Sequence, residues 1–211
     1  INNGKNVDLR WFTPDLEIDL CGHATLAAAH ILKSILHYPL DEIVFKTLSG
    51  VLRVTYQDGL YYLNLPSRAP ISAELPEEIK SALNIQPQEV YKARDYMLVY
   101  RNKQEIKDIQ INRQYFDQIN LGCGGVIVTA PGNTYDFVSR YFTPQATILE
   151  DPVTGSAHCT LIPFWSTRLS KKNLQTIQLS KRSGELSCRD NSDRVIVGGQ
   201  ATTYSSGEFF I

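Results

Sequence analysis

Two segments of this 211-residue chain repeat the same order of residues. RWFTPDLEIDLCGHATLAAA begins at Arg10, and SRYFTPQATILEDPVTGSAHCTL begins at Ser139. Each passes from Phe-Thr-Pro through an acidic strand to a Gly-x-Ala step that opens an apolar run. A spacing of about 130 residues is too long for a solenoid repeat. The duplication therefore predicts two related halves that face each other.

Strands dominate the rest of the pattern. Apolar alternation predicts three strands across 42–66, with a tight hairpin turn at Asp58-Gly59. Short helices are expected at 76–84 and, in two pieces, across 103–120. Further strands are expected at 7–12, 95–101, 125–130 and 134–142, and as a meander from 174 to the end of the chain.

Two predicted helices, 24–36 and 155–169, carry almost no polar face. A helix that is apolar nearly all round is buried nearly all round. Each is therefore expected to run through a sheet that curls around it. Pro163 lies inside the second helix and is expected to kink or divide it. The predicted fold class is α+β, with two pseudo-symmetric β-barrel-like halves, each around a central buried helix.

Charge and cysteine usage exclude several classes of function. The net charge is −1, which gives no basic surface for nucleic acid or an anionic membrane. No apolar run approaches the roughly 20 residues of a membrane helix. The four cysteines lack metal-ligand spacing, so no metal site is expected, and they are interpreted as reduced thiols of a cytoplasmic protein. Because the chain begins at Ile1 rather than Met, an N-terminal piece is expected to be missing.

Each repeated motif places a glycine and a polar residue at a helix N-terminus. The first N–H groups of a helix have no internal partner and carry the positive end of its dipole. Two such ends at one cleft would hold a small carboxylate. The reacting groups would be the side chains around it. The ordinary pKa of a histidine would let His23 take up and release a proton near neutral pH. Asp151, which precedes Pro152, would present a carboxylate. Cys21 and Ser156 are the other two candidates.

Each of these residues also has a purely structural interpretation. Ser156 and Thr154 could be helix caps, and Asp151 could satisfy backbone N–H groups. Cys159 is expected in the core, as free cysteines often are. The remaining histidines, His30, His37 and His158, are expected to be structural or solvent-facing. The duplication favours the functional interpretation of His23, Asp151 and Ser156.

The two motif segments, together with the tail QLSKRSGELSCR and DRVIVGGQA, resemble the phenazine-biosynthesis (PhzF-like) isomerase family over essentially the whole chain. The resemblance implies the diaminopimelate epimerase-like fold, with the active site in a cleft between the halves. It implies a cofactor-independent isomerisation that moves a proton on a small amino- or hydroxy-carboxylate, in a protein that often forms homodimers. The implied catalytic residues are His23, Asp151 and Ser156. The implied substrate-binding residues are Gly22, His23, Ala24, Gly155, Ser156 and Ala157.

One family feature has no counterpart in this sequence. The family's main acid/base is a glutamate in a Ser-Glu-Thr-Ala-Phe-like segment that would precede Ile1, and Glu17 and Glu150 do not align with it. The first half, 1–68, is therefore expected to lack its N-terminal part. The second half is expected to span 69–211, with its last strands returning to the first half.

Two alternatives stay open. A two-thiol epimerase or racemase shares this fold and needs a cysteine before each glycine. Cys21 meets that requirement, but Thr154 occupies the second position, which disfavours this chemistry. The other alternative is a non-catalytic binding protein that keeps the fold and the cleft, and the absent glutamate is its best support.

Overall fold

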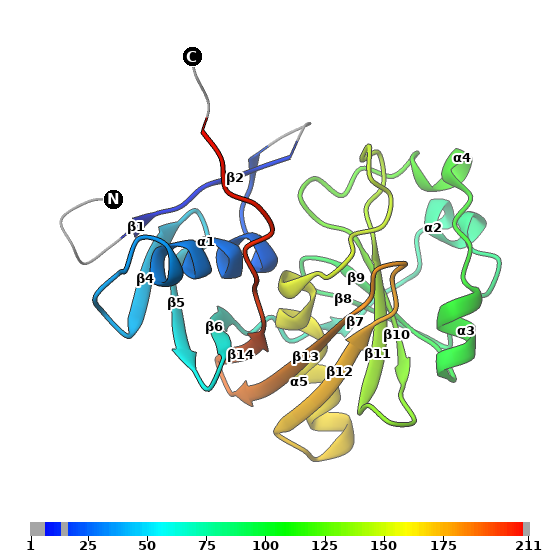
Figure 1. Ribbon diagram of the computed structural model, residues 1–211. Helices are drawn as coiled ribbons and strands as arrows, with labels where there is room; N and C mark the ends of the chain where they lie inside the picture. Colours follow the sequence, from blue (N-terminus) through cyan, green and yellow to red (C-terminus); the bar gives the residue numbers. More distant parts are fainter. Residues whose placement is uncertain (1–6, 14–16, 209–211) are drawn as a thin grey trace.

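A computed structural model describes residues 7–13 and 17–208 of the chain. Its described strands form a twelve-stranded mixed sheet and a separate two-stranded ribbon, β2-β3 (Figure 1). The order in the large sheet is β1-β4-β5-β6-β14-β13-β12-β11-β10-β9-β8-β7. The strands are β1 (Val7–Asp8), β2 (Trp11–Phe12), β3 (Glu17–Ile18), β4 (Glu42–Thr47), β5 (Gly50–Gln57), β6 (Leu60–Pro66), β7 (Ile71–Ser72), β8 (Glu89–Lys92), β9 (Tyr96–Val99), β10 (Val126–Pro131), β11 (Phe137–Phe142), β12 (Asn173–Gln178), β13 (Gly184–Asn191) and β14 (Arg194–Gly199).

The three strands predicted across 42–66 form two successive antiparallel hairpins, β4-β5 and β5-β6. The second hairpin turns at Asp58 and Gly59, whose φ angles are +52° and +82°. Two residues with positive φ make a turn whose twist matches that of the flanking strands, and Asp-Gly is a preferred pair there. This part of the prediction is confirmed.

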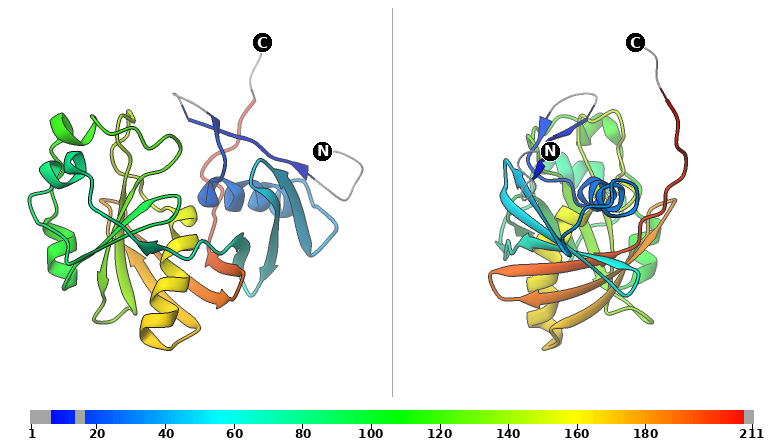
Figure 2. Two further views of the ribbon diagram at one scale, coloured as in Figure 1. Left: turned by 180° about the vertical axis from the view of Figure 1, so that it is seen from behind. Right: turned by 60° about the vertical axis from the view of Figure 1, so that its left-hand side comes forward.

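Helix α1 (Gly22–Ser34) lies against the β4–β6 part of the sheet (Figures 1 and 2). Its side chains are buried on one side only. Ile31 is 41% exposed, and beyond the helix Ile35 and Leu36 are 50% and 54% exposed. The prediction of burial on all sides is wrong for this helix. Among the described strands, the sheet passes along one face of α1, so only a single stripe can be covered. That stripe is Gly22, Thr25, Ala29 and Leu32.

The prediction of burial holds for most of helix α5 (His158–Leu169). Its residues from His158 to Ile162 are all buried, as are Trp165 and Ser166. The short 3-10 helix η1 (Gly155–Ala157) leads into it and is also buried. Strands β12, β13 and β14 pack against α5, so this helix has the enclosed position that its apolar sequence predicts.

Pro163 does not divide α5, which is continuous across it. Proline has no N–H to donate to the carbonyl four residues earlier, here that of Cys159. The Arg68 backbone N–H donates to that carbonyl oxygen instead, at 2.8 Å. The freed acceptor therefore ties the segment after β6 to the buried helix, and the carbonyl keeps a partner.

In the second half of the sheet, three short helices cover the face opposite to the one that packs against α5. They are α2 (Glu77–Ala82), α3 (Lys103–Asp108) and α4 (Arg113–Phe116), close to the ranges predicted for them. Ile79, Ile106 and Phe116 pack there against β10. Since α5 lies on the other face, β10 is buried from Val126 to Ala130, which explains its continuous apolar sequence.

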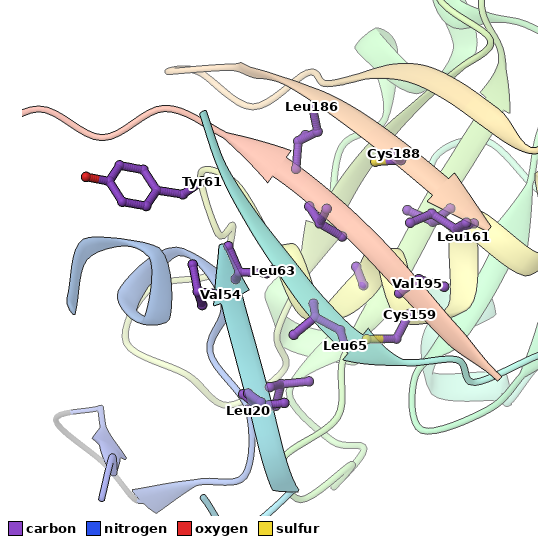
Figure 3. Close-up of a cluster of buried hydrophobic side chains, with 14 of the residues drawn as sticks. Leu20, Val54, Tyr61, Leu63, Leu65, Cys159, Leu161, Leu186, Cys188 and Val195 are labelled. Atoms are coloured by element: carbon purple, nitrogen blue, oxygen red, sulfur yellow. The ribbon is translucent and has the colours of Figure 1, made fainter. Parts of the chain in front are cut away.

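The last strand, β14, lies beside β6 and joins the two parts of the sheet, with Val197 opposite Leu63. Figure 3 shows Leu65, Val195 and Leu161 among the side chains gathered in the core between β6, β14 and α5. The proposed boundary at residue 68 stays a prediction. In residues 7–13 and 17–208, no helix has the length and apolar character needed to cross a membrane.

Candidate functional site

The two repeated glycines meet at the centre of the molecule. A Cβ atom built on Gly22 would lie 2.7 Å from the Gly155 Cα, and one built on Gly155 would lie 2.9 Å from the Gly22 Cα. No side chain fits between these backbones. The duplicated glycine therefore lets the start of α1 touch the start of η1, and it brings two motifs that lie far apart in the sequence to one place.

Within residues 7–13 and 17–208, neither helix start is capped by the side chain of its N-cap residue. The N-cap residues Cys21 and Thr154 make no side-chain cap hydrogen bond, and the first turns that follow them hold no acidic residue. The Thr154 hydroxyl instead donates to Asp151 Oδ2 at 2.6 Å, and Ser156 Oγ accepts from Arg94. The capping interpretation of Thr154 and Ser156 is therefore wrong. Backbone N–H groups at both helix starts are available to an anion.

His23 extends the start of α1 toward the other motif. Its Nδ1 lies 3.1 Å from the Val153 carbonyl oxygen, and its Nε2 lies 3.4 Å from Cys21 Sγ. A carbonyl can only accept, so Nδ1 carries a proton. The hydrogen bond with Cys21, with help from the charge of Asp151, outweighs desolvation and raises the pKa of His23 to about 9. The ring is therefore an imidazolium cation at neutral pH.

Asp151 lies in the loop just before η1. Burial raises the pKa of its carboxyl group, although the hydrogen bond from Thr154 and the positive charge of His23 act in the opposite direction. Gln178 of β12, only 1% exposed, fixes this loop. Its Nε2 donates to the Asp151 carbonyl at 2.7 Å, and its Oε1 accepts from the Thr154 N–H at 2.8 Å. Hydrogen bonds thus hold both the backbone of this loop and the Asp151 carboxylate, which interacts with the charge of His23.

A cleft of about 710 Å³ opens beside the paired glycines. Gly22, His23 and Gly155 line it. Its walls combine apolar side chains of α1 and β6 with polar ones of β12 and β13, including Leu26, Leu63, Gln175, Glu185 and Ser187. The volume suits a small organic molecule rather than a polymer.

The other predicted site residues are not part of this lining, but they lie within two positions of lining residues in the sequence. Ser156 and Ala157 are buried in η1, Ala24 is half-buried in α1, and Asp151 is half-buried in the adjoining loop. The structure therefore brings every predicted site residue to the junction of the two helix starts. Their catalytic and binding roles stay predictions. In the described part of the chain, no group of three or more His, Cys, Asp or Glu side chains could hold a metal ion.

The two-thiol alternative lacks a second accessible thiol near the cleft. Cys159 is fully buried in α5, and burial raises the pKa of its thiol to about 11. A thiol in this position is neither exposed nor ionised at neutral pH. Cys159 belongs to the core, as predicted.

Comparison with known proteins agrees with this geometry. The model of the PhzC-PhzF family, described as phenazine biosynthesis-like protein, matches residues 1–207. The chain belongs to this family. It is 42% identical over 208 residues to a Pseudomonas aeruginosa protein named an uncharacterized isomerase, covering 98% of this chain and 79% of that protein. A human phenazine biosynthesis-like domain-containing protein is 36% identical over 218 residues, covering 94% of this chain and 76% of the relative. These relationships identify the chain as an isomerase.

Solved structures confirm the predicted fold. The crystal structure of a PhzF-family phenazine biosynthesis protein from Enterococcus faecalis superposes with a TM-score of 0.91 at 41% identity, covering 100% of this chain and 81% of that one. A probable proline racemase from Agrobacterium radiobacter superposes with a TM-score of 0.63 at 9% identity, covering 97% of this chain and 72% of that one. This second likeness shows the fold alone, which is the α+β diaminopimelate epimerase-like fold.

Cys21, one of the four candidate reacting groups, contacts the His23 ring through its thiol. Sequence reasoning missed two other residues that shape this site. Gln178 and Arg94 contact the second motif from β12 and from the β8–β9 turn. No periodicity or motif marks either of them, so only the fold reveals their place.

Proposed function

We propose that this isomerase moves a proton between two carbon atoms of a small carboxylate substrate by general acid–base catalysis. The meeting of Gly22 and Gly155 carries the proposal, because it sets two uncapped helix starts side by side. The substrate carboxylate would bind to the free N–H groups there, next to the positively charged His23.

In the proposed reaction a base removes a proton from a carbon near the carboxylate, and the proton returns to another carbon of the same molecule. The atoms balance without an added reactant. Asp151 would accept and return the proton, since its raised pKa moves the carboxyl toward the range where both steps are feasible near neutral pH. The positive charge of the His23 imidazolium and a hydrogen bond from the Ser156 hydroxyl would stabilise the negative charge that develops on the substrate. Side chains and backbone of this chain would supply these groups, with no metal or organic cofactor.

Deuterium incorporation tests the proposal. The protein is incubated in D₂O with a panel of small unsaturated amino- and hydroxy-carboxylates, and mass spectrometry follows deuterium uptake and the appearance of isomers. We expect uptake that Asp151→Asn reduces by about 100-fold or more, within the usual contribution of a general base. Cys123→Ala serves as a control, since Cys123 is exposed and does not line the cleft. Carboxylate binding without exchange would favour the non-catalytic alternative, and absence of binding would contradict both interpretations.

A further inference from the structure

Arg94 contacts both halves of the candidate site from the turn between β8 and β9. Its side chain is only 17% exposed. Nη2 donates to Ser156 Oγ at 3.1 Å, and Nη1 donates to Asp19 Oδ1 at 3.1 Å. Asp19 lies three residues before Gly22, at the start of the first motif helix. One guanidinium group therefore joins the segment that leads into α1 to the first turn of η1.

The second half holds Arg94 firmly in this position. Asp95, 1% exposed, accepts from Arg94 Nη2 at 3.1 Å. Asp95 Oδ1 also accepts from the Gly125 N–H at 2.9 Å and from the Tyr141 hydroxyl at 3.0 Å. Burial lowers the pKa of Arg94, but the neighbouring carboxylates of Asp95 and Asp19 raise it above its ordinary value. Arg94 is therefore a cation at neutral pH.

Asp19 makes the corresponding contacts on the side of α1. Its Oδ2 accepts from Arg68 Nη2 and from the Ser49 hydroxyl, each at 3.2 Å. Two arginines thus hold one carboxylate of the first motif. Planar guanidinium groups fix direction as well as distance, which a single ammonium does not.

The contact with Ser156 also decides which way its hydroxyl acts. A guanidinium N–H only donates, so Ser156 Oγ is the acceptor in this hydrogen bond. The hydroxyl proton then points elsewhere and can be donated to a bound ligand. The adjacent positive charge strengthens that donation.

We propose that Arg94 is a positioning residue of this isomerase. It aligns the two helix starts through Asp19 and Ser156, and it orients the Ser156 hydroxyl as a hydrogen-bond donor toward the substrate. This inference rests on the proposed function, because the substrate it orients is the carboxylate of that proposal.

Two variants of Arg94 test this role. Arg94→Lys keeps the charge and loses the planar fork. Arg94→Met combined with Asp95→Asn removes the buried cation and anion together, which avoids leaving Asp95 as an unpaired buried charge. The matched control is Arg168→Met. Arg168 also donates two N–H groups to one carboxylate, that of Glu89, but this pair is on the surface and does not line the cleft.

The first measurement is steady-state kinetics. Both Arg94 variants are expected to lower kcat by about 10-fold to 100-fold with little change in KM, the scale expected for small misplacements of reacting groups. Arg94→Lys should be the less impaired of the two. Adding Ser156→Ala to Arg94→Lys should cost less than the product of the two separate losses, since residues that act through one contact are not additive. Fully multiplicative losses, or an equal loss in Arg168→Met, would overturn the positioning role.

The second measurement does not need activity. Amide hydrogen exchange is followed at Thr25 and Ala157, whose N–H groups donate to the Cys21 and Thr154 carbonyls at the two helix starts. Both amides should exchange at least several-fold faster in the Arg94 variants than in the wild type, and their exchange rates should be unchanged in Arg168→Met. If the wild type acts on no carboxylate, the proposed function fails, but the exchange result still decides whether Arg94 aligns the helix starts. Unchanged exchange at both amides would refute the inference.

Discussion

Replacing Gly155 by alanine puts the contact between the two motifs to a direct test. The new methyl carbon would lie 2.9 Å from the Gly22 Cα, which is backbone and cannot rotate away. Non-bonded carbons settle at about 3.5–4.0 Å, so the helix starts must separate by roughly 1 Å. Such overpacking typically costs about 1–3 kcal/mol. Alanine gains up to about 1 kcal/mol over glycine from helix propensity, so the net change should still be destabilising.

The effect on catalysis should be at least comparable to the net effect on stability. A displacement of roughly 1 Å between groups that must act together reduces rates by about 100-fold, which corresponds to about 2.7 kcal/mol of transition-state free energy. Urea denaturation measures the first quantity and deuterium exchange of the substrate measures the second. Gly207→Ala is the control, because a Cβ there meets no atom within 4 Å. If Gly155→Ala is as stable and as active as Gly207→Ala, the close contact does not shape the site.

Three further predictions address the surroundings of the site. The folded-state pKa of His23 is raised to about 9 from an ordinary 6.5, so its contribution to stability is complete below about pH 6.5 and is lost as the pH rises through 9. Urea denaturation across that range should show the free energy of unfolding falling, and His23→Gln should abolish the part of the fall that is due to His23. Gln178→Leu should destabilise the fold by about 2–4 kcal/mol by leaving the Asp151 carbonyl and the Thr154 N–H buried without partners, whereas exposed Gln175→Leu should change it by under about 1 kcal/mol in the same measurement. A thiol reagent should label exposed Cys123 and half-buried Cys21 in the folded protein, and buried Cys159 and Cys188 only on unfolding, since burial raises the pKa of both buried thiols; rapid labelling of all four would contradict this packing.

Much of the fold could be predicted from local patterns. The alternation across 42–66 and the Asp58-Gly59 turn depend on neighbours a few residues apart, and they predicted the hairpins correctly. The duplicated Gly-x-Ala step predicted that two distant segments share a role, and the structure places Gly22 against Gly155. A repeat carries such long-range information because both copies are visible in the sequence.

Contacts between unlike residues far apart in the sequence could not be predicted. Arg94 and Ser156 are separated by 62 positions and belong to no repeat. The exposure of Ile31 also depends on which strands lie beside α1, whereas its apolar sequence indicates only that burial would be favourable. The sequence of a helix indicates which apolar side chains could be buried, and the topology determines which elements cover them.

The two helix starts each have a glycine after an extended N-cap residue, but they differ in chemistry. At the first helix start the polar group is the His23 cation, in contact with Cys21. At the second it is the neutral Ser156 hydroxyl, which accepts from Arg94. A racemase that works equally from both faces of one carbon needs matched acid–base groups on both sides, and this pair does not match. We therefore expect the asymmetric site to move a proton between two different carbons, so that in D₂O the label appears on the carbon that gains the proton. Deuterium found only on the carbon that lost the proton, with inversion of its configuration, would instead indicate an epimerase. That result would contradict the inference drawn from the asymmetric site.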